Sequence, residues 1–437
     1  MDLLEAARSF IPTRRRVRIG VTGLRRSGKT SLLTSLAVNL LANALPALTE
    51  RLQGRPLTVA LAASGAEDTP RFDPIEKSAA LAEDPPHWPR PTDTVSLLAL
   101  DLQIGHAGLA AILPPQKLRL EFVDYPGEWL MDLPLLKDSF QSWSATTLRR
   151  LEHRPEAHDF LAFVYGLPAQ VAPDDQLIAA GHDLYVSCLQ AMQQAGCALL
   201  QPGRFLMPAP GAASPWQSFF PHPGSGRLPR LLEMRFSAYQ RAVRDSLAGP
   251  GFKGIDRLVV LADLLGALHA GQAAFEDTAE ALCLVARALS HQSPLPLLPG
   301  WLQPWGLQRI AFAATKADHV AQRQRANLAA LMAQLVPPPQ GPSWRSFAIA
   351  SICCTEDFIW ALDSRPVSAV RGHLEGLGRV RSYPGEVPDR RPGALDWGHP
   401  FLELPDFSPK RLAPGGRGVI DQIGLDRLLS FLLEDML

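Results

Sequence analysis

The sequence lacks a surplus of charge of either sign. Its 437 residues include 43 Lys and Arg against 43 Asp and Glu, so the formal net charge is zero. A chain with balanced charge has no general attraction to polyanions. The composition therefore predicts no nucleic-acid partner.

Cysteine is scarce, and its pattern argues against two kinds of site. The five cysteines are Cys188, Cys197, Cys283, Cys353 and Cys354. Their number is odd and their spacing matches no metal-ligand pattern, while the adjacent pair suits neither a disulfide nor a zinc site. We therefore expect free, buried thiols in a protein of the reducing cytoplasm.

Long hydrophobic runs are also absent. The most apolar stretch, residues 31–48, is too polar and slightly too short to span a membrane. Asp2, Glu5 and Arg8 precede any apolar stretch, which is not typical of a signal peptide. The basic run at 14–16 could contact anionic lipid, so peripheral membrane association stays open. A solvated approach to the first strand is the simpler interpretation, because three charges make a weak patch.

What the chain does contain is typical of a folded protein larger than one domain. Hydrophobic residues make up 46% and charged residues 20%, and the 40 prolines are interleaved with apolar residues. The prolines therefore indicate long structured loops rather than disorder. The length predicts a core with a large insertion or a second domain.

Residues 17–34 carry the clearest motif. Gly23-Leu-Arg-Arg-Ser-Gly28-Lys29-Thr30 fits the phosphate-binding loop pattern, in which Lys and a hydroxyl residue follow the second of two glycines. A strand-like alternation precedes the motif and a helical apolar pattern follows it, which is the setting that it requires. In such a loop, backbone N–H groups and the helix N-terminus bind phosphate. The alternative is an ordinary glycine-rich turn before a buried helix.

The motif predicts roles for individual side chains. Lys29 would neutralise the β- and γ-phosphates, and Thr30 would bind Mg²⁺. Arg26 is a second candidate for catalysis beside Lys29. The residues expected to contact the phosphates are Gly23, Arg25, Arg26, Ser27, Gly28, Lys29, Thr30 and Ser31.

Two threonines precede the next expected strand. Residues 49–93 form a long irregular stretch rich in Pro, Ala and charge, and an apolar alternation begins at Val95. In switch-type nucleoside triphosphatases, a threonine at this place closes over the γ-phosphate and Mg²⁺. Thr92 is the first candidate and Thr94 the second, and both could equally be loop residues before a strand.

Residues 118–124 alternate like a strand and end on Asp124. Asp124-Tyr-Pro-Gly127 fits Asp-x-x-Gly, in which the aspartate holds Mg²⁺ through water and the glycine N–H meets the γ-phosphate. The letters alone are weak evidence, and their position after a strand expected beside the loop strand strengthens them. Glu128 could act as a base, orient the attacking water, or simply start the next segment.

A base-recognition motif follows a further buried strand. The apolar run 309–314 leads into Thr315-Lys-Ala-Asp318. In Asn/Thr-Lys-x-Asp the aspartate accepts hydrogen bonds from guanine N1 and N2, donors that adenine lacks, and the lysine, here Lys316, lies along the base. Ser351, after the next expected strand, would support the base. Alternatively, Lys316 and Asp318 form the polar first turn of a helix.

The spacing of apolar residues in the middle of the chain predicts helices. Apolar spacing near 176–199 and 230–248 is helical, and a loop rich in Pro, Gly and Ser separates the two. We therefore expect a helical insertion in an α/β core, with the loop aromatics Trp216, Phe219 and Phe220 buried. Other expected elements are a strand at 256–263, a helix at 272–291, a strand at 344–351, a surface loop at 384–417 and a C-terminal helix from 424.

Several runs resemble the bacterial YcjX-like proteins, and the resemblance spans nearly the whole chain. The runs are Gly-Leu-x-Arg-Ser-Gly-Lys-Thr-Ser at 23–31, Asp-Tyr-Pro-Gly-Glu-Trp-Leu with Asp-Leu-Pro-Leu-Leu within 124–136, Gln-Pro-Gly-Arg-Phe at 201–205, Asp-Arg-Leu-Val-Val-Leu-Ala-Asp at 256–263, Thr-Lys-Ala-Asp at 315–318 and the C-terminal helix. The Trp88-Pro89-x-x-Thr92 match favours Thr92 over Thr94. Family members usually carry Ser where Arg25 stands, so Arg25 could stabilise phosphate charge or point to solvent.

The resemblance implies a GTPase-like P-loop protein of the bacterial cytoplasm, which binds GTP or GDP with Mg²⁺ and has a stress-associated role. We favour a switch that hydrolyses GTP slowly over an ATPase or kinase on the same scaffold, or a nucleotide-loaded scaffold that hardly hydrolyses. Its catalytic residues would be Lys29, Thr92, Glu128 and Arg26, its metal ligands Thr30, Thr92 and Asp124, and its further nucleotide contacts Gly127, Thr315, Lys316, Asp318 and Ser351.

The expected fold is α/β, with a mostly parallel sheet flanked by helices. Residues 1–150 would form the N-terminal half of the core, and 151–255 a large helical insertion. Residues 256–437 would form the C-terminal half, with the base-recognition loop and the C-terminal helix. A protein partner is expected on the helical insertion.

Overall fold

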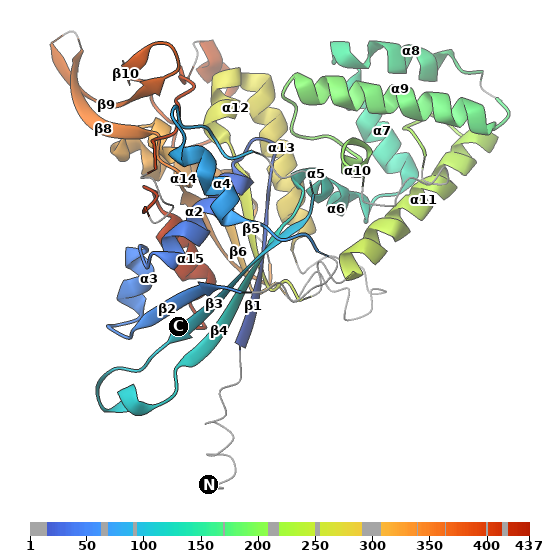
Figure 1. Ribbon diagram of the computed structural model, residues 1–437. Helices are drawn as coiled ribbons and strands as arrows, with labels where there is room; N and C mark the ends of the chain where they lie inside the picture. Colours follow the sequence, from blue (N-terminus) through green and yellow to red (C-terminus); the bar gives the residue numbers. More distant parts are fainter. Residues whose placement is uncertain are drawn as a thin grey trace, which may run out of the picture.

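A computed structural model describes residues 15–62, 69–90, 94–168, 171–208, 218–249, 254–290, 307–338, 340–362, 364–398, 401–412 and 418–437. Its centre is a seven-stranded sheet with the order β2-β3-β4-β1-β5-β6-β7, and a second sheet has the order β10-β9-β8 (Figure 1). The strands are β1 (Arg15–Gly23), β2 (Leu57–Leu61), β3 (Ser96–Ile104), β4 (Gln116–Asp124), β5 (Arg257–Ala262), β6 (Arg309–Ala314), β7 (Ser343–Ala348), β8 (Thr355–Leu362), β9 (Arg365–Leu374) and β10 (Gly378–Ser382).

The central sheet is mostly parallel. β1 pairs in parallel with β4 and β5, and β5, β6 and β7 continue the parallel order. β3 is antiparallel to both β2 and β4. Because β4, β1, β5, β6 and β7 run in one direction, the loops after them gather at one edge of the sheet, where α/β proteins bind ligands.

Helices cover both faces of this sheet (Figure 1). They are α2 (Lys29–Leu41), α3 (Pro46–Arg51), α4 (Pro74–Ala82), α5 (Gly127–Leu130), α6 (Asp132–Leu135), α7 (Phe140–Leu151), α8 (His158–Gly166), α9 (Asp175–Gln194), α10 (Gly203–Leu206), α11 (Arg227–Ala248), α12 (Leu264–Ala270), α13 (Gln272–Ala288), α14 (Arg325–Leu335) and α15 (Leu425–Leu432). Apolar residues of α2, α3 and α15 pack with Val17, Ile19 and Val21 of β1. Those of α12, α13 and α14 pack on the other face, against residues such as Val260 and Phe312. The fold is therefore α/β, as the sequence predicts.

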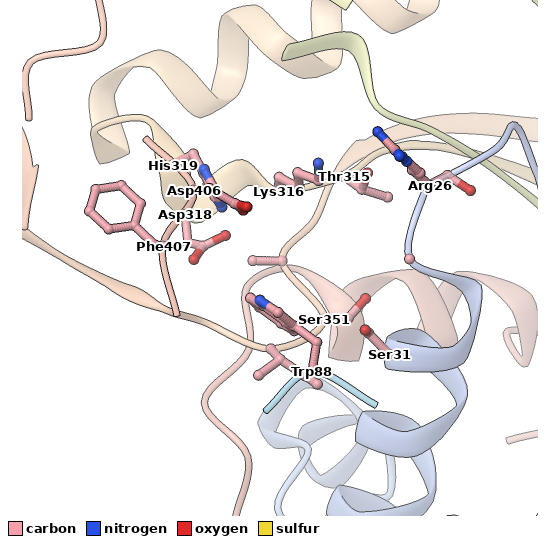
Figure 2. A pocket seen from close by; sticks show the side chains of 14 residues that line it. Arg26, Ser31, Trp88, Thr315, Lys316, Asp318, His319, Ser351, Asp406 and Phe407 are labelled. Carbon is pink, nitrogen blue, oxygen red and sulfur yellow. The ribbon is translucent and has the colours of Figure 1, made fainter. Parts of the chain in front are cut away.

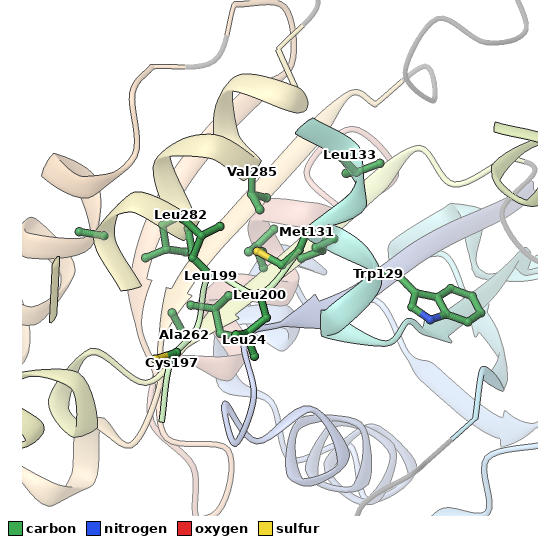
Figure 3. Packing of buried hydrophobic residues seen from close by; sticks show 14 of the residues in the cluster. Leu24, Trp129, Met131, Leu133, Cys197, Leu199, Leu200, Ala262, Leu282 and Val285 are labelled. Carbon is green, nitrogen blue, oxygen red and sulfur yellow. The ribbon is translucent and has the colours of Figure 1, made fainter. Parts of the chain in front are cut away.

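Helices α7 to α11 lie between β4 and β5 in the chain and extend away from the sheet (Figure 1). Their interior is aromatic: Trp143 packs against Tyr185, Phe219 and Phe236 with ring centroids 5.2–6.2 Å apart. This interior joins the apolar layer under α13, so one hydrophobic cluster runs through both parts (Figure 3). The expectation of buried aromatics is confirmed for Phe219 and Phe220, and Trp216 lies outside the described residues.

Two expectations about local structure are wrong or incomplete. Residues 49–93 are not irregular throughout, because β2 and α4 form within them. The sheet β8–β10 occupies a stretch to which the sequence patterns assign no element. The five cysteines are free, as expected, although Cys283 is partly exposed. Of the helices in the described ranges, none has the length and apolarity that crossing a membrane requires.

Candidate functional site

The chain turns sharply between the end of β1 and the start of α2. Gly28 caps α2 with a φ of 82°, which glycine adopts without strain. Gly23 is required for another reason, since a Cβ there would lie 2.5 Å from the Leu261 carbonyl oxygen. The turn therefore presents the first N–H groups of α2 at the edge of the sheet where the parallel strands end. Such a helix N-terminus favours a bound anion.

A pocket of about 850 Å³ opens at this turn. It is lined by Arg25, Arg26, Ser27, Gly28, Lys29, Thr30 and Ser31, by Pro89 and Thr94, by Asp124, Pro126 and Glu128, and by Gln193, Leu206, Met207 and Pro208. The fold thus brings together the side chains that the sequence assigns to phosphate and Mg²⁺, from three separate stretches of the chain. Thr94 lines the pocket, whereas Thr92 falls outside the described residues.

The end of β4 lies directly against the turn. Asp124 is in register with Val21 of β1 and is only 3% exposed. A Cβ on Gly127 would lie 1.7 Å from the Gly23 carbonyl oxygen and 3.6 Å from Lys29 Nζ. Only glycine fits at this position, so the main chain of Gly127 packs directly against the turn, close to Lys29.

Arg25 makes a contact that the sequence does not indicate. Its Nη1 donates a hydrogen bond of 2.9 Å to the main-chain oxygen of Gln193, in the last turn of α9. The carbonyl end of a helix carries partial negative charge, which suits a guanidinium. Arg25 therefore connects the turn to α9.

A second pocket, of about 340 Å³, adjoins the first (Figure 2). Arg26, Ser27, Gly28 and Ser31 line both pockets. The remaining wall consists of Thr315, Lys316, Asp318 and His319 after β6, Ala350, Ser351 and Ile352 after β7, and Trp88, Asp406 and Phe407. Ser31, Ser351 and Trp88 lie across the pocket from Asp318 and His319 (Figure 2). The motif after β1 and the motif after β6, which begin 292 residues apart in the sequence, therefore line two adjoining pockets.

Asp318 is held in a fixed orientation. Its Oδ2 accepts a hydrogen bond of 2.8 Å from the Cys354 N–H and another of 3.1 Å from the Cys354 thiol. Burial, together with the nearby Asp318 charge, raises the pKa of the Cys354 thiol far above its ordinary value, so the thiol remains protonated and can donate. Thr355 Oγ1 donates to the main-chain oxygen of Asp318. These contacts fix the carboxylate, which is 2% exposed, at the pocket wall.

Lys316 is held at the junction of β5 and β6. It has a positive φ of 61°, and its Nζ forms an ion pair of 2.5 Å with Asp263 Oδ2. The other oxygen of Asp263 accepts a hydrogen bond of 2.8 Å from the Gly266 N–H at the start of α12. The positive φ and the ion pair explain why this lysine does not begin an α-helix: a short 3-10 turn follows it instead.

Some residues of the two pockets carry no local sequence signal. His319, Asp406 and Phe407 reach the smaller pocket, and Gln193 and Met207 reach the larger one. The Gln-Pro-Gly-Arg-Phe run just before Met207 is the one hint in the sequence, because the resemblance singles it out. His319 directly follows Asp318, Gln193 lies in the last turn of α9, and a long loop brings in Asp406 and Phe407.

Comparisons with known proteins identify the family of the chain. Residues 17–437 match the YcjX-like family, DUF463. The chain is 33% identical to "Ras-like GTPase YcjX" of Escherichia coli (strain K12), with 97% of this chain and 96% of that protein covered. It is 29% identical to "Ras-like GTPase YcjX" of Shewanella oneidensis, with 97% and 95% covered. A match over nearly the whole length of the chain, at this level of identity, shows common descent, and the chain belongs to the YcjX-like family.

Proposed function

We propose that this protein binds GTP and GDP together with Mg²⁺, hydrolyses GTP slowly, and acts as a nucleotide-dependent switch in a stress-related process of the bacterial cytoplasm. The observation that carries the proposal is that the two pockets adjoin and share the lining residues Arg26, Ser27, Gly28 and Ser31. One has a helix N-terminus and Lys29, which suit phosphates, and the other has the oriented Asp318 carboxylate, which suits guanine. The relatives named Ras-like GTPase support the same conclusion.

In this proposal Gly23–Thr30 is a P-loop. Its N–H groups and Lys29 bind the phosphates, and Ser27, Gly28 and Ser31 line the passage to the base. Thr30 and Asp124 offer hydroxyl and carboxylate oxygens in one pocket, a donor set that Mg²⁺ prefers. Thr30 and Asp124 would hold the ion there, and its charge would offset that of the β- and γ-phosphates.

The residues around the γ-phosphate have proposed roles in hydrolysis. The Gly127 N–H meets the γ-phosphate, Glu128 orients or deprotonates the attacking water, and Arg26 stabilises developing negative charge. Thr92 remains the proposed switch threonine and Thr94, in the pocket wall, the second candidate.

At the base, Asp318 would accept from guanine N1 and N2, Lys316 would lie along the ring, and Thr315 and Ser351 would close the pocket. Cys354 takes one oxygen of the carboxylate and sets its orientation toward the base. A carboxylate so held discriminates strongly, because a base without the two donors leaves it unpaired.

The proposal assigns different roles to different parts of the chain. Residues 1–150 and 256–437 form the two halves of the GTPase core, and residues 151–255 are a helical insertion. We propose that a protein partner binds the insertion, because its residues reach the phosphate pocket at Gln193 and Met207.

Base recognition is tested by comparing the affinities for GDP, ADP and xanthosine diphosphate. We expect a strong preference for GDP, which Asp318→Asn shifts to the xanthosine nucleotide. Xanthine carries a carbonyl acceptor in place of the guanine amino group, and the amide of Asn can donate to that carbonyl. Asp406→Asn is the matched control, since Asp406 lines the same pocket but does not belong to the motif. An equal preference for ADP, or no shift in Asp318→Asn, would contradict guanine recognition.

Hydrolysis is tested by multiple-turnover phosphate release with Mg²⁺. We expect slow release that Lys29→Ala abolishes, because the transferred phosphoryl loses its main positive partner. Removal of Mg²⁺ with a chelator should have the same effect. Tight GTP binding without release would favour the nucleotide-loaded scaffold instead.

A further inference from the structure

The segment that follows β4 is held by the Gln-Pro-Gly-Arg-Phe run. Gln201 Nε2 donates to the Met131 main-chain oxygen at 2.8 Å, and the Gly203 N–H donates to Asp132 Oδ1 at 2.8 Å. Arg204 Nε lies 3.5 Å from Asp132 Oδ2. Asp132 is 0% and Arg204 8% exposed, so this ion pair is buried. Paired charges in a low-dielectric interior interact strongly, so they restrict the groups that carry them.

Arg204 also contacts the segment through Trp129. Its guanidinium carbon lies 4.7 Å from the indole ring centroid, within the range of a cation–π interaction. The Trp129 indole N–H donates to the Met207 main-chain oxygen at 2.7 Å. Met131 and Leu199 belong to one apolar cluster, which closes the same region from the side of the sheet (Figure 3).

The Gly127–Glu128 main chain is enclosed on two sides. A Cβ on Gly203 would lie 1.7 Å from the Glu128 carbonyl oxygen and 2.4 Å from its carbonyl carbon. On the other side, Gly127 touches the Gly23 carbonyl oxygen. The position of Glu128 in the phosphate pocket therefore depends on both the turn after β1 and the run that contains Gly203.

We propose that Arg204 is a positioning residue for Glu128, acting through Asp132 and Trp129 to fix the main chain from Glu128 to Met131. Arg204 is not among the described residues that line the two pockets. Its influence on the site therefore passes through Asp132 and Trp129. The inference rests on the proposed function only for the role of Glu128 in hydrolysis. The fixing of the segment can be measured without turnover.

The first test compares Arg204→Gln with Arg235→Gln in the full-length protein. Arg235 is a matched control, because it is 5% exposed on α11 and pairs with Asp175 at 2.5 Å, at the start of α9. Hydrogen exchange is followed at the Trp129 and Met131 amides, which donate to main-chain oxygens of the same segment. We expect Arg204→Gln to speed exchange at these amides by about tenfold or more, because Asp132 loses its buried ion-pair partner and Trp129 loses the guanidinium over its ring. Arg235→Gln should leave them unchanged.

The second test is the single-turnover rate of GTP hydrolysis beside the affinity for GDP. Arg204→Gln should lower the rate by about tenfold or more, because a displaced Glu128 no longer meets the water. The GDP affinity should stay within about threefold, since the phosphate turn is untouched. Arg204→Lys keeps the charge without the planar guanidinium and should recover part of the rate.

Gly203→Ala provides an independent variant if Arg204→Gln does not fold. The added methyl would lie 1.7 Å from the Glu128 carbonyl oxygen, and should produce the same pattern of faster exchange and slower hydrolysis. Unchanged exchange at Trp129 and Met131 in both variants overturns the proposal. So does equal loosening in Arg235→Gln, or faster exchange with an unchanged hydrolysis rate.

The two proposals fail in different ways. A wild-type protein that binds no guanine nucleotide, or binds GTP without hydrolysing it, refutes the proposed function. The exchange measurement on the nucleotide-free protein then still decides whether Arg204 fixes the segment.

Discussion

Replacing Gly127 with alanine is the most direct test of how the end of β4 meets the turn after β1. The new methyl would lie 1.7 Å from the Gly23 carbonyl oxygen, where ordinary contact begins at 3.4 Å. Gly23 cannot yield, because it ends β1 and the next N–H, that of Leu24, donates to the Leu261 oxygen at 2.9 Å. The main chain at Gly127 must therefore move by roughly the missing 1.7 Å.

Two consequences have estimable sizes. Overpacking against main chain that cannot relax lowers the free energy of unfolding by about 3 kcal/mol, the upper end of the usual range. Misplacement of a catalytic group by about 1 Å can lower a rate by about a hundredfold, and Glu128, the proposed water-orienting residue, follows Gly127 directly. GDP has no γ-phosphate for the Gly127 N–H to meet, so we expect its affinity to change by no more than about threefold.

The assay combines urea unfolding with single-turnover hydrolysis and GDP binding. Gly166→Ala at the end of α8 is the control, because a Cβ there meets no atom within 4 Å. We expect the control to match the wild-type protein in all three measurements. Wild-type stability and hydrolysis in Gly127→Ala would refute the close packing of Gly127 on the turn.

Three further predictions concern buried polar groups. Burial raises the pKa of Asp132 to about 6 from an ordinary 3.8, so its contribution to stability is full below pH 3.8 and lost as the pH rises through 6. Urea unfolding between pH 4 and 7 should show a weaker fall with pH in Asp132→Asn. Glu121→Ala should lower the free energy of unfolding by about 3 kcal/mol, because it leaves the guanidinium of Arg18, which is 5% exposed, without the Glu121 carboxylate. Cys354→Ala should weaken GDP binding about fivefold, since Asp318 loses the thiol donor while Cys354→Ser keeps one.

The elements that the sequence predicts best are those with strong local signals. β5 and β6 are continuous apolar runs, and nearly every residue in them is buried, because helices cover both faces of the sheet. The turn after β1 carries its own glycines, and the residues before and after it have the period of a strand and of a helix. Neighbouring residues determine such features, so the pattern suffices.

Other elements needed information that local patterns do not contain. One residue of β8 and three residues of β9 are buried, so neither strand is a continuous buried apolar run. The two strands are stabilised by pairing with each other and by a small cluster around Val370. α4 does carry a local signal, which lies within a proline-rich stretch. Asp73 precedes Pro74, and its side chain accepts from the Ile75 and Glu76 N–H groups as a helix cap.

The site divides in the same way. Lys29, Asp124 and Asp318 each follow a strand of the parallel sheet, so the fold class alone places them at one edge. Asp406 and Phe407 come from a long loop, and Arg204 acts from a run near the end of α9, so only tertiary packing brings them there. The sequence therefore predicts which motifs meet at this edge of the sheet, but not the residues that other parts of the chain bring to them.

The two glycine contacts on either side of Gly127–Glu128 have a mechanical consequence. Side chains absorb small displacements by changing rotamer, whereas main chain in direct contact has no such compliance. From Gly23 through Gly127 and Glu128 to Gly203, main-chain atoms touch without an intervening side chain. A shift on the order of tenths of an ångström at the turn would therefore reach α10 almost undiminished. Gly23, Gly127 and Gly203 therefore form a rigid series of main-chain contacts between the turn after β1 and α10.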